Sequence, residues 1–258
     1  MNLQLQPLLF VHMIRGRNKK IEGNKKDMRR VMIGVPIIAL LIAIGMTMSC
    51  VKSTKKQATH KELIPKFIFG KKGTGLGDLA KPHGLATKNN YLYVAESGNA
   101  RVQVLEIQPD GNLVSKFTFG ARGEKIGEFR GNHGLAVKNN YLYLIDAANA
   151  RIQVLEIQPD GNLVSKFTFG KEGKSLGEFQ TPLALAIKDN FLYAADSGNF
   201  RIQALEIQPN GDLVSKFTFG KEGKGLGEFG FIENLAIKNN FFYVSDTGNN
   251  CIQILEIK

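Results

Sequence analysis

The chain has 258 residues, 43% of them hydrophobic, and a formal net charge of +11 at pH 7, which suits one large β domain with an appendage. The charge is uneven: residues 1–66 hold 13 Lys and Arg against 3 acids, whereas residues 67–258 hold 21 against 20. Extensive contact with phosphates needs clustered Lys and Arg, so the nearly neutral main region excludes a typical nucleic-acid-binding domain, and we expect no nucleic-acid partner.

The N-terminal part consists of a basic leader, residues 1–30, and a signal or transmembrane segment, residues 31–50. The first 18 residues of this segment, VMIGVPIIALLIAIGMTM, carry no charge. A membrane-spanning helix needs about 20 such residues, so we expect one hydrophobic helix here. The Lys and Arg before it predict a cytoplasmic N terminus and an extracytoplasmic main region. Residues 51–65 then predict a flexible, polar linker that tethers the main region to the cell membrane.

The segment ends in Thr-Met-Ser-Cys at residues 47–50, which resembles a bacterial lipobox. The resemblance makes Cys50 a lipidation candidate, although Thr47 stands where the motif usually has Leu. The alternative is an uncleaved signal-anchor helix. A start at Met28 would give a compact signal, so residues 1–27 are either an over-called start or a cytoplasmic extension.

The main region is a tandem repeat. The stretch LEIQPDGNLVSKFTFG occurs at residues 105–120 and 155–170, and again at 205–220 with two changes, so the period is 50 residues. Each unit carries four β-rich segments separated by turn residues, which is typical of a propeller blade. In the first unit we expect strands at residues 84–88, 91–96, 101–107 and 113–119. Turns are expected at Asn89 and Asn90, and at residues 109–112.

Glycine-rich connections follow residues 70, 120, 170 and 220. Their spacing is similar to that of a dinucleotide-binding loop, but such a loop should open a helix and here a strand follows. We therefore expect no nucleotide and no other cofactor. We interpret the glycines as allowing close packing between neighbouring blades.

After each second strand the sequence repeats a longer pattern. It reads YVAESGNARVQV from Tyr93, YLIDAANARIQV from Tyr143, YAADSGNFRIQA from Tyr193 and YVSDTGNNCIQI from Tyr243. These runs, over residues 66–257, resemble the NHL repeat family. The resemblance implies a β-propeller. It also implies a function from the family's range, which is mostly protein binding, sometimes RNA binding and in a few enzymes cleavage of small substrates.

The predicted fold is therefore an all-β, four-bladed propeller over residues 66–258. The segment KFIF at residues 66–69 matches an outer strand but precedes any blade, and the last blade lacks an outer strand. We predict that residues 66–69 pair with residues 251–257 and close the ring, because this leaves no open strand edge. The alternative is an open arc that a second chain completes.

Two sets of side chains are expected on one face near the axis. The first set, one per blade, is His83, His133, Leu183 and Glu233. Two His and one carboxylate can hold a divalent metal, but we interpret them as polar residues at a channel mouth and predict no metal. The second set is Glu96, Asp146, Asp196 and Asp246, each followed by Asn and, in three units, by Arg. Its recurrence indicates a structural hydrogen-bond network, and together with His83 and His133 these acids are also candidates for a binding face. Cys251 replaces the Arg of the other units as a tolerated substitution.

These observations favour a membrane-tethered, extracytoplasmic scaffold that binds a protein or peptide. The sequence shows no paired acids, nucleophilic triad or CxxC motif that stands out from the repeats. The alternative is an exported metal-dependent lyase or lactonase that uses His83, His133 and Glu233, so the question of enzymatic activity stays open.

Overall fold

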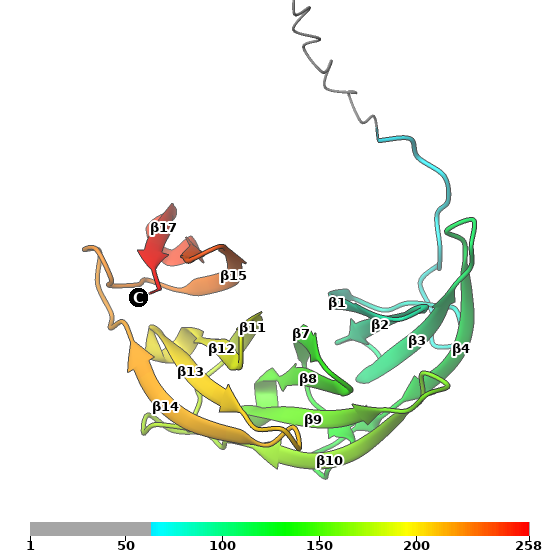
Figure 1. The fold of residues 1–258 in the computed structure, drawn as a ribbon, viewed down its shortest axis with the longest axis horizontal. Helices are drawn as coiled ribbons and strands as arrows, with labels where there is room; N and C mark the ends of the chain where they lie inside the picture. The colour runs from blue at the N-terminus through cyan, green and yellow to red at the C-terminus, as the bar shows by residue number, and fades with distance from the viewer. Residues whose placement is uncertain (1–62, 258) are drawn as a thin grey trace, which may run out of the picture. The chain divides into compact units, whose positions relative to one another are not determined.

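The computed structural model describes residues 63–257, which consist almost entirely of strands and turns (Figure 1). The basic leader, the expected hydrophobic helix, Cys50 and most of the linker lie outside the described residues. In the part of the chain that is described, no helix is long and apolar enough to cross a membrane.

The strands form four consecutive antiparallel sheets, three with four strands and the last with three. The first blade contains β1 (Pro82–Lys88), β2 (Tyr91–Glu96), β3 (Arg101–Ile107) and β4 (Leu113–Phe119). The second contains β7 (Asn132–Lys138), β8 (Tyr141–Asp146), β9 (Arg151–Ile157) and β10 (Leu163–Phe169). The third contains β11 (Pro182–Lys188), β12 (Phe191–Asp196), β13 (Arg201–Ile207) and β14 (Leu213–Phe219). The fourth contains β15 (Ile232–Lys238), β16 (Phe241–Asp246) and β17 (Cys251–Glu256). This confirms the predicted four-bladed propeller arrangement.

The connections follow the expected turn chemistry. Asn89 has a positive φ of 51°, and its counterparts Asn139, Asp189 and Asn239 share this conformation, which Asn and Asp tolerate in a tight hairpin. Three short 3-10 helices join second to third strands: η1 (Ala147–Asn149), η2 (Ser197–Asn199) and η3 (Thr247–Asn249). Within one glycine-rich connection, two short strands form a parallel pair: β5 (Ala121–Arg122) and β6 (Glu128–Phe129).

The hydrophobic core lies between the blades, in three clusters. Tyr93, Val102 and Val104 of the first blade pack against Leu142 and other residues of the second. The same arrangement is repeated between the second and third blades and between the third and fourth. Blade stacking therefore supplies most of the apolar burial, as expected of repeats that cannot each bury their own hydrophobic faces.

The predicted ring closure is not formed. Residues 63–70 contain no strand, and β17 pairs only with β16 among the described residues. Figure 1 shows the first residues of the described chain, in cyan, beside the first blade, while β17, in red, stands at the other end of an open arc. The prediction assumed that matching strand sequences suffice for pairing. The stacking of the blades, which sets the curvature, does not bring these two segments together.

Glycine at the axis allows the closest approach between blades. A Cβ on Gly84 of β1 would lie 2.3 Å from the backbone oxygen of His133, and one on Gly134 of β7 would lie 2.9 Å from that of Leu183. Glycines in the connections also lie between blades. A Cβ on Gly127 would lie 3.0 Å from Ser165 of the second blade and 3.6 Å from Phe119 of the first. Close packing between blades therefore involves glycines in the connections, as expected from the sequence, and also glycines in the inner strands.

Candidate functional site

The four inner strands meet around a polar pocket of about 290 Å³. The lining side chains come from the first residues of β1, β7, β11 and β15. They include His83, His133, Leu183, Glu233 and Asn234. The structure therefore brings together the first predicted set of axis residues, one from each blade. Asn234 was not predicted, because the other three units have Gly or Ala at that offset.

His83 and His133 are direct neighbours, with ring centroids 4.3 Å apart and an angle of 34° between the ring planes. Partial burial lowers the pKa of His133 below its ordinary value of 6.5, and the neighbouring His83 lowers it further. Glu233 acts in the opposite direction and raises the pKa. Desolvation and a like charge both disfavour the imidazolium form of His133, and a neutral imidazole offers one ring nitrogen as a hydrogen-bond acceptor.

The metal hypothesis needs three ligands at bonding distance from one point. Within residues 63–257, no three His, Cys, Asp or Glu side chains are grouped closely enough to hold a metal ion. His83, His133 and Glu233 thus share a pocket without forming a three-ligand cluster. The arrangement offers hydrogen-bond acceptors and a carboxylate, which suit a polar or positively charged group of a ligand.

The second predicted set forms a buried network in each blade. In the second blade, Asp146 is completely buried. One carboxylate oxygen accepts the backbone N–H of Arg130 at 2.6 Å. The other accepts Asn149 Nδ2 at 2.8 Å, Arg151 Nε at 2.9 Å and Gln153 Nε2 at 3.2 Å. Every oxygen of this carboxylate is therefore used inside the blade.

The arginine in this network also fixes the glycine-rich connection. Arg151 donates from Nη1 to the carbonyl oxygen of Glu124 at 2.6 Å and from Nη2 to those of Lys125 and Glu128 at 2.8 and 3.0 Å. Arg101 and Arg201 make the equivalent bonds in the first and third blades. In the fourth blade the position holds Cys251, which is exposed.

These findings correct the expectation that Glu96, Asp146, Asp196 and Asp246 contribute to a binding face. All four are fully buried, and each accepts hydrogen bonds within its own blade. The glutamine of each network was missed by the sequence analysis. Its signal was present, because Gln103 recurs at the same offset in all four third strands.

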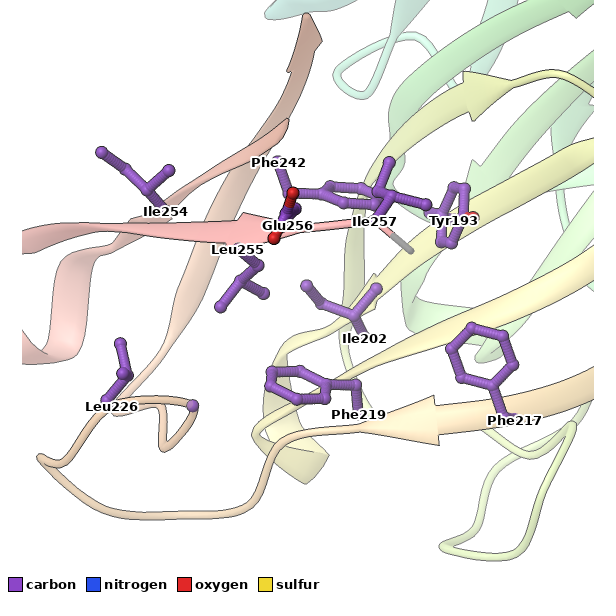
Figure 2. Close-up of a pocket in the computed structure, with 11 residues that line it drawn as sticks. Tyr193, Ile202, Phe217, Phe219, Leu226, Phe242, Ile254, Leu255, Glu256 and Ile257 are labelled. Atoms are coloured by element: carbon purple, nitrogen blue, oxygen red, sulfur yellow. The ribbon is translucent and has the colours of Figure 1, made fainter. Parts of the chain in front are cut away.

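A second cavity, of about 500 Å³, lies beside the fourth blade and is mainly apolar. Figure 2 shows Ile202 and Phe219 of the third blade opposite Leu255 of β17, and Phe217 beside Tyr193 of the same blade. In the first and second blades, the equivalent phenylalanines pack within the cores between blades. Phe217 and Phe219 are instead exposed, because no outer strand of the fourth blade covers them among residues 63–257.

Comparisons with known proteins agree with this architecture. The family model of the NHL repeat matches residues 79–105, which confirms the resemblance in the first repeat. No curated protein matches the chain.

Solved structures with a similar fold include a candidate 6-phosphogluconolactonase from Bacteroides uniformis. It is 18% identical with a TM-score of 0.54, over 67% of this chain and 52% of that one. A protein from Lactobacillus plantarum is 16% identical with a TM-score of 0.55, over 69% of this chain and 54% of that one. The chain thus spans about half the length of each, and at these identities the likeness is one of fold.

Proposed function

We propose that the protein is a membrane-tethered, extracytoplasmic scaffold that binds a protein or peptide partner at the axis pocket. The proposal rests on one observation, which is that the residue at the axis position differs between the blades. The units copy their outer hairpins almost letter for letter, yet the axis position holds His83, His133, Leu183 and Glu233. All four residues line the same pocket. A purely structural position would keep the same type of residue in every blade, as the buried carboxylates do, with Glu96 in the first blade and Asp in the other three.

The pocket's size and chemistry suit one polar group of a partner. A volume of about 290 Å³ accommodates a single side chain or a chain terminus. A neutral His133 accepts a hydrogen bond, and the Glu233 carboxylate attracts a positive charge. A lysine or arginine side chain, or the free amino group of a peptide, meets both requirements.

Affinity capture from envelope extracts tests the binding function. The bait is the full chain, compared with a variant that carries His83→Ala, His133→Ala and Glu233→Ala. A matched control carries Asp110→Ala and Asp160→Ala, which change exposed turns between third and fourth strands. We expect a partner that the wild type and the turn variant retain and the axis variant loses. Capture that survives the axis changes, or no specific capture, contradicts the proposal.

The membrane tether rests on residues 31–50 and has its own test. Mass spectrometry of the mature protein from the membrane fraction should find a chain that begins at a lipidated Cys50. A membrane-bound chain that retains residues 31–48 would instead support the signal-anchor helix. Recovery of the protein in the soluble fraction without either feature would contradict a tether.

A second candidate is an exported metal-dependent lyase or lactonase with the same pocket as its active site. The proximity of His83 and His133, whose ring centroids lie 4.3 Å apart, favours it, because imidazole is a common ligand of zinc. The fold shared with a candidate 6-phosphogluconolactonase is compatible with it. Elemental analysis after exposure to zinc, followed by lactone hydrolysis assays, tests this candidate. A bound zinc content no higher than background would rule out this candidate.

A further inference from the structure

The fourth blade exposes a face that every other blade buries. Tyr143, Ile152 and Val154 of the second blade are completely buried under the third blade. Their counterparts in the fourth blade are Tyr243, Ile252 and Ile254, which are 37%, 61% and 56% exposed. This end of the arc therefore presents the same apolar surface that binds the next blade elsewhere in the molecule.

The first blade exposes the complementary face. Leu135 of β7 packs against the first blade and is 8% exposed, whereas its counterpart Leu85 of β1 is 61% exposed. The two ends of the arc thus carry the two halves of the interface that already occurs three times within the chain. Because the repeats are nearly identical, the exposed face of a first blade can pack against the exposed face of a fourth blade, as neighbouring blades do within the chain.

The chain also contains a segment whose sequence matches the outer strand that the fourth blade lacks. Residues 63–70, LIPKFIFG, correspond to residues 113–120, LVSKFTFG. In the second and third blades the first leucine of this strand, Leu163 or Leu213, is buried against the preceding blade. Leu63 is 97% exposed. The apolar cavity beside β17 opens at the corresponding place, next to Tyr193 and Ile202 of the third blade (Figure 2).

Charge complementarity points to the same pairing. In each complete blade a lysine of the outer strand binds a glutamate of the third strand: Lys116 with Glu106, Lys166 with Glu156 and Lys216 with Glu206. The corresponding residues of the fourth blade are Lys66 and Glu256. Neither forms an ion pair within the described part of the chain.

We propose that a second copy of this chain completes the propeller. The partner's residues 63–69 pair with β17 and fill the apolar cavity, and its first blade covers the exposed face of the fourth blade. The same contacts at the other junction, related by two-fold symmetry, close a ring of eight blades, a number within the usual range for propellers. A second copy fits better than self-closure because a chain's own residues 63–69 lie at the far end of its arc (Figure 1).

Disulfide trapping tests the junction. The pairing of Glu106 with Val114 in the first blade predicts that Glu256 faces Ile64 in the same register, and opposite residues in neighbouring strands lie within disulfide reach. The background is the full chain with Cys50→Ser and Cys251→Ser. One variant adds Ile64→Cys, a second adds Glu256→Cys and a third adds both. The matched control adds Glu106→Cys and Val114→Cys.

After mild oxidation, we expect the double variant to migrate as a covalent pair of chains on a non-reducing gel. A mixture of the two single variants should give the same pair, and each single variant alone should remain one chain. The control should form its disulfide within one chain, which also shows that the blades have folded. A disulfide within one chain of the double variant would overturn the proposal, as would a ladder of longer polymers. So would no disulfide in the double variant under conditions that oxidise the control completely.

Discussion

At the scale of single residues, the axis pocket depends on the protonation state of His133. Its pKa is lowered by burial and by His83, and Glu233 raises it. We expect His83→Gln to raise the pKa of His133 and Glu233→Gln to lower it. NMR titration of the imidazole protons measures both shifts. Equal pKa values in the wild type and both variants would mean that these three side chains are not electrostatically coupled.

The same shift predicts how stability depends on pH. Because the folded-state pKa of His133 lies below its unfolded value of about 6.5, the unfolded chain binds the proton more readily. The contribution to stability is therefore complete above pH 6.5 and decreases as the pH falls below it. Urea unfolding at pH 7 and pH 5 should show a larger loss of stability for the wild type than for His133→Gln. An identical loss would contradict this assignment.

Cys251 marks the one blade in which the buried carboxylate has no arginine. Burial by itself would raise the pKa of Asp246, but hydrogen bonds from Asn249, Gly230, Phe231 and Gln253 outweigh burial and hold the pKa below its usual value. Cys251→Arg should add an ion pair and bonds to the glycine-rich connection. We expect an increase in stability of about 1–2 kcal/mol in thermal or urea unfolding. Cys251→Ser is the control, and a gain no larger than that of the serine variant would contradict the argument.

At the scale of elements, the spacing of the inner strands depends on Gly84. An alanine Cβ at this position would lie 2.3 Å from a backbone oxygen of β7, so the first two blades would have to separate. We expect Gly84→Ala to destabilise the protein by about 1–3 kcal/mol. Gly75→Ala serves as control, because its Cβ would first meet the flexible Asp78 carboxylate at 3.1 Å. Equal unfolding midpoints for the two variants would show that the axis is not tightly packed.

The elements themselves were predictable because their signals are local. The strands β2, β3 and β4 have the predicted bounds, and β1 begins two residues before its predicted start. The equal offset of His83 and His133 in the repeats predicted that both lie near the axis on one face, but it did not show that they converge. It was not predictable that residues 66–69 would fail to pair with β17. The sequence of a strand shows which segments can pair, but the packing between blades determines where each segment lies. Burial of the four acids was ambiguous for the same reason, since a repeated polar residue fits a network or a surface.

At the scale of the whole molecule, the open arc leaves the apolar face of its last blade exposed to water. Three junctions between blades bury their apolar faces, while Ile252 and Ile254 remain largely in water at the end of the arc. Complete burial of one such side chain contributes about 1.5–3 kcal/mol. A second copy that covers this face therefore stabilises the folded chain. By mass action, that stabilisation must increase with protein concentration.

The melting temperature should accordingly rise when the protein is concentrated. We expect Ile254→Asp to abolish this dependence, because a charge at the junction opposes burial, whereas Val164→Asp, at an exposed position of an outer strand, should preserve it. Differential scanning calorimetry over a hundredfold range of concentration makes the comparison. Self-closure within one chain would give the wild type a melting temperature independent of concentration. Assembly through some other surface would leave the dependence intact in Ile254→Asp, so the two variants together separate this junction from every other contact.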